Sequence, residues 1–381
     1  MLAGSATALG RASHAADWSQ TLEASANAAY ATNPALVPGS SIADELAQLS
    51  IDGNTTAQSE LDQLTVTPRL SITRYDHETG LNYETGAISL AYQHNLERGQ
   101  WTLNGQALTD STLTSELGLT GITEINRRHY ASTLAAGYQY LTTERLSWEA
   151  QASWQDTRYT NAQQFGLTNY RYWSVQFGPL WNFTDRLVGQ LSLETDQISP
   201  QSQPAEKDYS ATLQLKRKLS EQYAWRISAG ATRVDTPGAY DTTSSVFEVG
   251  ASRQTERVQW DVAIRRSVLP IGLGLLARED QATASIAVST SERSTLSLAV
   301  SILRTDPVSL LFYLDPQISF SYLVYAGASW GAVNGEWRYN FSPHWALSLA
   351  FSQARARNND VPQWANGNQA RLGVVWQSGR L

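Results

Sequence analysis

The sequence contains no cysteine, and this absence excludes several kinds of site and scaffold. Its 381 residues offer no thiol for a lipid anchor, a disulfide, a thiolate metal site or a cysteine nucleophile. Methionine occurs once, and charged residues make up only 17% of the chain. The formal net charge is -7 and the basic residues form no patch, so we expect no nucleic-acid partner.

Long apolar runs are missing as well. No stretch approaches the ~18 to 20 continuous apolar residues that a membrane-spanning helix requires. A chain that crosses a membrane without such helices does so as a closed β-barrel, because lipid offers no partner to unpaired backbone groups. The 13 Trp and 17 Tyr fit a barrel, since amphipathic aromatic residues collect where a membrane meets water.

Apolar and polar residues alternate in segments of about ten to fourteen residues, the length of a tilted membrane strand. In the segment 148–155, for example, Trp and Ala at even positions alternate with Glu, Gln and Ser at odd positions. The same period of two recurs in the segments 173–183, 187–193, 209–215, 225–231, 247–251, 260–264, 284–288, 296–302, 347–351 and 369–377. This repetition predicts antiparallel strands with one face toward lipid and one toward water.

The connections between these segments alternate in length. Short turns are predicted at 142–145, 184–186, 220–222, 255–257, 291–293 and 342–344. Longer loops are predicted near 32–61, 110–127, 157–168, 197–207, 235–243, 267–279, 303–319 and 355–367. Bacterial barrels place short turns in the periplasm and long loops outside, so the longer set is expected to face the exterior.

We therefore expect an all-β fold, a transmembrane antiparallel up-and-down β-barrel of about 16 strands, with 14 or 18 as alternatives. A raw count gives about 17, an odd number that bacterial barrels avoid. The uncertain regions are 62–110, interpreted as three strands, and 303–341. The segment 32–61 is interpreted as a loop, in which Ile42, Leu46 and Leu49 have helical spacing and predict a plug or a short external helix.

We divide the chain into a leader, a barrel and a tail. Residues 1–16 end in Ser13-His14-Ala15-Ala16, a small-x-small pattern that predicts the remnant of a signal peptide, with a disordered N-terminus as the alternative. Residues 17–377 are expected to form a single barrel domain. Residues 378–381 would then be a short C-terminal tail.

Several short motifs accompany the strands. They are Ala31-Thr32-Asn33-Pro34, Val66-Thr67-Pro68-Arg69-Leu70, Asp110-Ser111-Thr112, the recurring Thr-Glu-Arg or Ser-Glu-Arg turns, and the segment from Arg266 to Gly274. With these motifs, the chain from Trp18 to Trp376 resembles the porin-like outer-membrane β-barrels of Gram-negative bacteria that are often associated with exopolysaccharide export. The resemblance implies an outer-membrane location and carries over no catalytic residue.

Two sets of residues follow from the alternation. Charged residues on the inner faces are expected to line a lumen, because charges that face lipid are costly: Glu149, Glu194, Lys216, Lys218, Arg226, Glu248, Asp261, Arg265 and Glu336. They would either tune passage through a polar pathway or pair with one another and fill the barrel. Aromatic residues are expected at the membrane interface: Trp148, Trp154, Trp173, Trp181, Trp225, Trp260, Trp337, Trp345 and Trp376.

Neither catalysis nor cofactor binding is predicted. The five histidines pair with no nucleophile at a recognisable spacing, and His129 is interpreted as a surface residue beside basic neighbours. The acidic loop residues match no metal-binding loop, so we expect no metal site. Pro270, Gly272 and Gly274 are not followed by the Lys-Ser/Thr of a phosphate loop and predict a tight extracellular turn.

The hypothesis from sequence is an outer-membrane channel that passes polar solutes or a saccharide chain, without a cofactor. The alternative is a non-conducting structural or anchor barrel of a surface-polymer export system, and an outer-membrane enzyme is a third reading. The expected partners are the lipid bilayer, lipopolysaccharide and the barrel-assembly machinery, together with a polysaccharide or small polar solutes.

Overall fold

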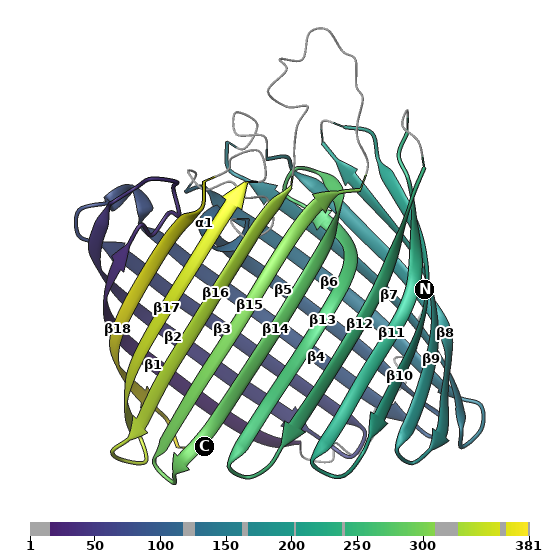
Figure 1. Ribbon diagram of the computed structural model, residues 1–381. Coiled ribbons are helices and arrows are strands. Elements are labelled where there is room, and N and C mark those ends of the chain that lie inside the picture. The colour runs from purple at the N-terminus through teal and green to yellow at the C-terminus, as the bar shows by residue number, and fades with distance from the viewer. Residues whose placement is uncertain are drawn as a thin grey trace, which may run out of the picture.

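Eighteen antiparallel strands follow one another around a closed barrel (Figure 1). The computed structural model describes residues 16–116, 126–161, 167–201, 203–237, 241–308, 327–358 and 363–379. Each strand pairs with its neighbours in sequence, and the first strand pairs with the last over the register Glu23↔Gln377 to Thr32↔Asn368. This last pairing closes the sheet, so no strand edge is left open.

The strands are long enough to cross a bilayer at a tilt. Their bounds are β1 Asp17–Thr32, β2 Ala43–Gln58, β3 Asp62–Tyr75, β4 Tyr83–Leu96, β5 Gly99–Ser111, β6 Arg128–Leu141, β7 Leu146–Tyr159, β8 Tyr170–Thr184, β9 Leu187–Pro200, β10 Glu206–Lys218, β11 Tyr223–Asp235, β12 Thr242–Gln254, β13 Val258–Ile271, β14 Leu275–Ser291, β15 Ser294–Pro307, β16 Ala328–Asn340, β17 Trp345–Asn358 and β18 Ala365–Gln377. In the described parts of the connections there are two short helices, η1 (Thr79–Leu81) and α1 (Thr112–Ser115). No helix in the described part of the chain is long and apolar enough to span a membrane.

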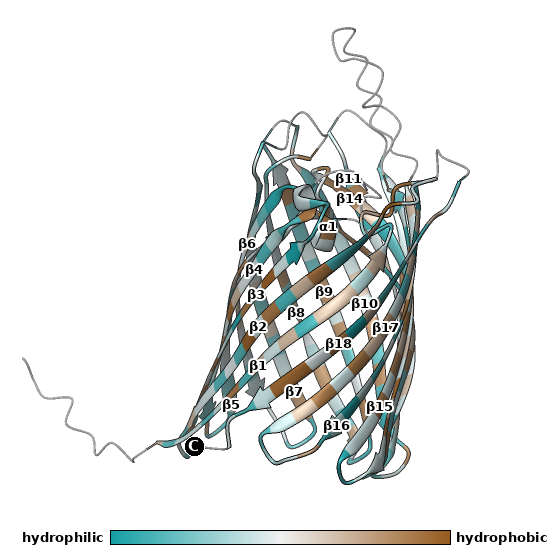
Figure 2. Ribbon diagram, turned by 90° about the vertical axis from the view of Figure 1, so that its left-hand side faces the viewer, coloured by the Kyte–Doolittle hydropathy of each residue, from teal (hydrophilic) through white to brown (hydrophobic). Residues whose placement is uncertain are grey.

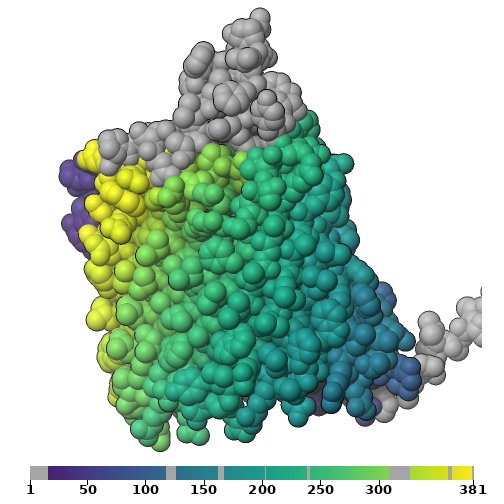
Figure 3. All heavy atoms as spheres, turned by 45° about the vertical axis from the view of Figure 1, so that its right-hand side comes forward, coloured from purple at the N-terminus to yellow at the C-terminus, as the bar shows by residue number. Residues whose placement is uncertain are grey.

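The outer face of the barrel is apolar. Large hydrophobic side chains that alternate along each strand are exposed there, such as Leu49 and Ile51 on β2, and Val262 and Ile264 on β13. Figure 2 shows the resulting alternation of hydrophobic and hydrophilic residues along the strands, and on the face drawn in Figure 3 the side chains form a continuous wall. A closed barrel with an apolar exterior is the architecture of bacterial outer-membrane proteins, and the protein belongs in that membrane.

The predicted short turns lie at one end of the barrel, called the turn end here, and the longer connections lie at the opposite loop end, together with the short β13–β14 turn (Figure 1). Hydroxyl side chains organise the predicted short turns. Thr143 Oγ1 accepts a hydrogen bond from the amide of Leu146 over 3.0 Å, and Thr184 Oγ1 accepts one from the amide of Leu187 over 3.0 Å. Such local bonds satisfy backbone donors that the strand ladder leaves unpaired.

The predicted count of about 16 strands is wrong, and 18 is the number observed. The predicted loop and helical plug at 32–61 contain strand β2, whereas the three strands predicted in 62–110 are present as β3, β4 and β5. Leu46 and Leu49 have helical spacing because they point to opposite sides of the wall. Leu46 is buried with Ala29, Ala31 and Tyr75, while Leu49 is 58% exposed on the outer face.

Most of the expected leader, residues 1–15, lies outside the described residues, and so do 309–326 from the uncertain region 303–341. β15 ends at Pro307 and β16 begins at Ala328. The predicted loop 267–279 is much shorter than expected, because β13 continues to Ile271 and β14 begins at Leu275.

Candidate functional site

The inner wall of the barrel is the candidate functional site, and it differs between the two ends. Buried apolar clusters occur near the loop end, where Tyr159, Leu167, Ile198, Val234 and Leu276 pack together. Further down the wall, inner side chains keep much of their exposure: those of Arg226, Glu248 and Asp261 are 30%, 29% and 42% exposed. The interior is therefore packed at the loop end, and it is polar and solvent-accessible between there and the turn end.

The hairpin between β13 and β14 narrows the loop end. Its tip lies against wall residues that belong to distant strands: the amide of Thr168 donates to the carbonyl of Gly272 over 2.9 Å, and the amide of Leu276 donates to Glu206 Oε2 over 3.0 Å. Gly274 has a φ of 74°, and a Cβ there would lie 2.2 Å from Cγ2 of Thr168. The tight turn predicted from the glycines thus forms, and it is fastened to the wall rather than projecting outward.

A buried polar chain lies against the tip, where a Cβ on Gly272 would be 2.4 Å from Glu116 Oε2 and 2.7 Å from the hydroxyl of Tyr159. His129 Nδ1 lies 2.7 Å from Asp110 Oδ1, and the His129 ring stacks on Tyr159 with centroids 5.0 Å apart. The hydroxyl of Tyr159 donates to Glu116, whose pKa is raised by burial. His129 is only 6% exposed, so its assignment to the surface was wrong. The alternation along β6 could have placed it inside, because the neighbouring Tyr130 faces out.

The charges predicted for the inner faces occupy the register opposite to the exposed apolar residues of their strands. Arg226 lies between two of them. It contacts Glu248, and its Nη1 lies 2.9 Å from Asp261 Oδ2. Arg265 Nη2 lies 2.8 Å from Glu279 Oε1.

The remaining predicted inner residues are spread around the wall. Glu194 accepts a hydrogen bond from Ser174 over 2.8 Å, and Glu149 accepts one from Gln190 over 2.7 Å. Lys216 and Lys218 border a hollow of about 320 Å³ at the turn end, together with Asp185. The predicted charges therefore do not converge on one site, but form separate polar contacts along the inner wall.

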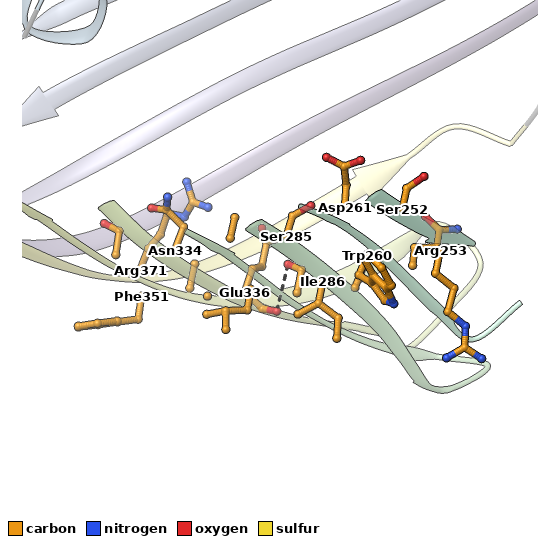
Figure 4. A pocket seen from close by; sticks show the side chains of 18 of the residues that line it. Ser252, Arg253, Trp260, Asp261, Ser285, Ile286, Asn334, Glu336, Phe351 and Arg371 are labelled. Atoms are coloured by element: carbon orange, nitrogen blue, oxygen red, sulfur yellow. Dashed lines mark hydrogen bonds between the residues drawn. The ribbon is translucent and has the colours of Figure 1, made fainter. Parts of the chain in front are cut away.

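A larger cavity of about 640 Å³ follows the inner wall from β12 to β18. Figure 4 shows Ser252, Asp261, Ser285, Asn334 and Arg371 on one side of the strands, with Trp260, Ile286 and Phe351 on the other. The predicted lumen residue Glu336 also borders this cavity. The cavity therefore has a lining rich in serine, amide and charged side chains.

A second cavity, of about 280 Å³, lies nearer the loop end and includes Tyr75, Tyr83 and Trp330 in its lining. Ser352, Gln369 and Arg371 border both cavities. The two spaces therefore adjoin along β17 and β18, with Arg371 at their junction. Sequence reasoning did not select Arg371, although the alternation along the last strand places it opposite to Leu372.

Two further acidic residues lie on the inner face and were not among the predicted inner charges. Asp196 on β9 and Asp208 on β10 face each other in register and are 4% and 3% exposed. Their Oδ1 atoms accept no hydrogen bond from the described residues. Asp196 lies beyond the predicted segment 187–193, and Asp208 lies just before the predicted segment 209–215, whereas β9 continues to Pro200 and β10 begins at Glu206.

Seven of the predicted interface tryptophans gather at the turn end, within a few residues of the strand ends: Trp148, Trp181, Trp225, Trp260, Trp337, Trp345 and Trp376. Trp154 and Trp173 face each other in register farther up the wall. Trp148 stacks on Phe177 with ring centroids 5.2 Å apart. The aromatic residues thus mark one boundary of the apolar outer band more clearly than the other.

No family model and no curated protein matches the sequence. Among solved structures, OprD of Pseudomonas aeruginosa is 10% identical, with a TM-score of 0.44 over 94% of this chain and 95% of that chain. OccK5 of the same organism is 8% identical, with a TM-score of 0.49 over 95% and 99%. A BenF-like porin of Pseudomonas fluorescens is 9% identical, with a TM-score of 0.49 over 95% and 98%. So little sequence is shared that no residue role passes from those porins to this chain.

Among the described residues, no group of three or more His, Cys, Asp or Glu side chains is arranged to hold a metal ion. His129 hydrogen-bonds Asp110 and stacks on the ring of Tyr159, and neither contact is that of a base with a hydroxyl nucleophile. What the inner wall offers chemically is a set of hydrogen-bonding and charged groups beside adjoining polar cavities.

Proposed function

We propose that the protein is a porin-like channel that lets small polar solutes cross the outer membrane. The observation that carries this proposal is the pair of adjoining cavities along β17 and β18, bordered by Ser352, Gln369 and Arg371. Polar groups along such a path replace part of the hydration of a passing solute. The partial exposure of Arg226, Glu248 and Asp261 favours a pathway over a barrel filled by paired charges.

Acidic residues outnumber basic ones among the inner charges, which favours passage of cations over anions. The acidic set on the inner register includes Glu23, Asp52, Glu149, Glu194, Asp196, Glu206, Asp208, Glu248, Asp261, Glu279 and Glu336, and the basic set is Arg69, Lys216, Lys218, Arg226, Arg265, Arg338 and Arg371. A low-dielectric wall focuses this field into the lumen and raises the local concentration of cations.

A saccharide is the second candidate solute, favoured by the aromatic side chains of the second cavity, the one nearer the loop end. Tyr75, Tyr83 and Trp330 border this space. Flat apolar rings with polar edges offer a contact surface for sugar rings, while neighbouring Ser352 and Gln369 provide hydrogen bonds. Export of a long polysaccharide would need more room than about 280 Å³.

Solute uptake into liposomes tests these proposals. Vesicles that contain the folded protein should swell in small polar solutes, faster with a small amine than with a carboxylic acid of equal size. Trp330→Ala should slow swelling in a disaccharide but leave the amine rate unchanged if the second cavity contacts sugars. Swelling no faster than in protein-free vesicles, for every solute, would contradict the channel proposal.

A further inference from the structure

The outer face carries arginine residues at the loop end, just where the apolar band stops. Arg74 is the next-to-last residue of β3 and Arg158 the next-to-last of β7, while β6 begins at Arg128 and Arg171 is the second residue of β8. All four share the register of exposed apolar residues on their own strands, such as Leu70 on β3 and Trp154 on β7. We call these four residues the arginine collar.

Two carboxylates each join a pair of these arginines. Arg74 Nη2 lies 2.5 Å from Glu84 Oε1, and Arg128 Nη2 lies 3.2 Å from Glu84 Oε2. In the second cluster, Arg158 Nε lies 2.6 Å from Asp156 Oδ2, and Arg171 Nε lies 3.4 Å from Asp156 Oδ1. Each carboxylate is thus shared by two guanidinium groups. Glu45 and Asp76 border the same hollow as Arg74 and offset its charge, so the surplus of positive charge lies at Arg158 and Arg171.

The two clusters form one continuous patch. Tyr130, two residues after Arg128, faces Arg158 directly in the pairing of β6 with β7, and Asp156 faces Arg171 in the pairing of β7 with β8. The collar side chains remain open to the surroundings, with exposures of 46% for Arg74, 49% for Arg128, 63% for Arg158 and 69% for Arg171. Arg158 and Arg171 each direct one of their five N–H donors to Asp156, whereas Arg74 also donates from Nη1 to the carbonyls of Thr73 and Tyr83.

The height of the patch fits a membrane surface. About ten residues of β7 separate Trp148, among the turn-end aromatics, from Arg158. A strand rises ~3.4 Å per residue and tilts by about 40° in a barrel, so these residues span roughly 25 Å of height. This equals the height of the apolar band of outer-membrane barrels, ~25 Å. If Trp148 marks the periplasmic boundary, the collar lies at the headgroups of the outer leaflet.

We propose that the arginine collar binds the phosphate groups of lipopolysaccharide, the phosphorylated glycolipid of the outer leaflet. Guanidinium groups recognise phosphate oxygens through paired N–H donors. Glu84 and Asp156 hold the arginines in fixed orientations, so less rotamer freedom is lost when a phosphate arrives. The surplus charge, the outward direction and the position at the loop end all match a phosphate-bearing lipid rather than a solute in the lumen.

Thermal unfolding of the folded full-length protein in detergent tests the site. The probe is the purified lipid anchor of lipopolysaccharide, a glycolipid that carries two phosphate groups. The shift of gel mobility on heating reports whether the barrel is folded. The wild type should unfold at a higher temperature as the glycolipid is added, and the dephosphorylated glycolipid should produce no such rise. Arg158→Gln with Arg171→Gln should weaken the apparent affinity by about tenfold per arginine removed.

Two controls separate phosphate binding from general charge and from misfolding. Arg217→Gln with Arg253→Gln removes outward arginines at the turn end and should leave the glycolipid response unchanged. Arg158→Lys with Arg171→Lys keeps the charge and should restore only part of the affinity. The proposal is overturned if the dephosphorylated glycolipid stabilises the wild type equally, or if the collar variant responds like the wild type. An equal response to phosphatidylglycerol through the same arginines would also overturn the assignment to the glycolipid.

Discussion

The amide of Thr168, just before β8, donates a hydrogen bond of 2.9 Å to the carbonyl of Gly272 at the tip of the β13–β14 hairpin. This bond joins a turn to a part of the wall that lies several strands away around the barrel. The neighbouring Gly274 makes the approach possible, because any side chain there would collide with Thr168. The contact draws the hairpin tip against the wall and narrows the loop end, although this segment was predicted to form an outward loop.

Gly274→Val should detach this tip. A β-branched residue at a φ of 74° is strained, and its Cβ would also lie 2.9 Å from Cβ of Pro200. We expect a loss of about 1–3 kcal/mol in the free energy of unfolding and a larger unitary conductance. Single-channel recording measures the second effect. Gly331→Ala is the matched control, because the nearest atom to its Cβ is 3.7 Å away. A folded Gly274→Val protein with wild-type conductance would show that the tip does not limit passage.

The tip should also respond to pH through Glu116. Burial raises the pKa of this carboxyl, so the folded protein retains a proton that the unfolded chain releases. The resulting stabilisation is complete below the ordinary carboxyl range and is lost as the pH rises through the elevated pKa. Conductance should therefore increase as the pH rises through that window. Glu116→Gln, which stays neutral, should remove the dependence, and an unchanged pH profile in this variant would assign it to another group.

Charge reversal on the inner wall should change ion selectivity. Lys216→Glu with Lys218→Glu adds negative charge beside the turn-end hollow, so the reversal potential in a salt gradient should move further toward cations. Arg371→Glu should act in the same direction at the junction of the two cavities. Arg217→Gln is the control, since Arg217 lies between the two lysines but points out. A shift of equal size in the control would mean that the inner register does not line the pathway.

The short turns should contribute measurably to stability. Thr184→Ala removes the acceptor for the amides of Arg186 and Leu187. We expect a loss of about 0.5–1.5 kcal/mol in the free energy of unfolding, observed as a lower urea midpoint in lipid vesicles. Thr184→Ser keeps the acceptor oxygen and should recover most of the loss. If both variants unfold like the wild type, hydrogen bonds to water replace these bonds without a change in the free energy of unfolding.

The barrel could be predicted from sequence because its wall has one chemical rule, an apolar outer face and a polar inner face. Strands that keep this rule, such as β7 and β13, were located correctly, although β13 continues to Ile271 and so enters the predicted loop 267–279. β2 was missed because Leu46 faces inward into a buried cluster, which breaks the rule and imitates a helical period. The alternation of apolar and polar residues within one strand cannot reveal that an inner position is buried by residues far away in the sequence.

The same limit explains the candidate site. The alternation assigned charges such as Arg226 and Glu248 to the inner register, but it could not show that they contact each other. Asp196 and Asp208 were lost at predicted strand ends, and the inward path of the hairpin depends on contacts between residues about 100 positions apart, such as Thr168 and Gly272. These features arise from closure of the barrel, which brings remote segments together.

Current through a planar lipid bilayer tests the central claim most directly. The purified, detergent-folded protein is inserted and recorded under an applied voltage, before and after charge reversal of Lys216, Lys218 and Arg226. We expect discrete conductance steps in the wild type, with altered amplitude and selectivity in the triple variant. A protein that is folded by its heat-dependent gel mobility but never conducts would contradict the channel proposal.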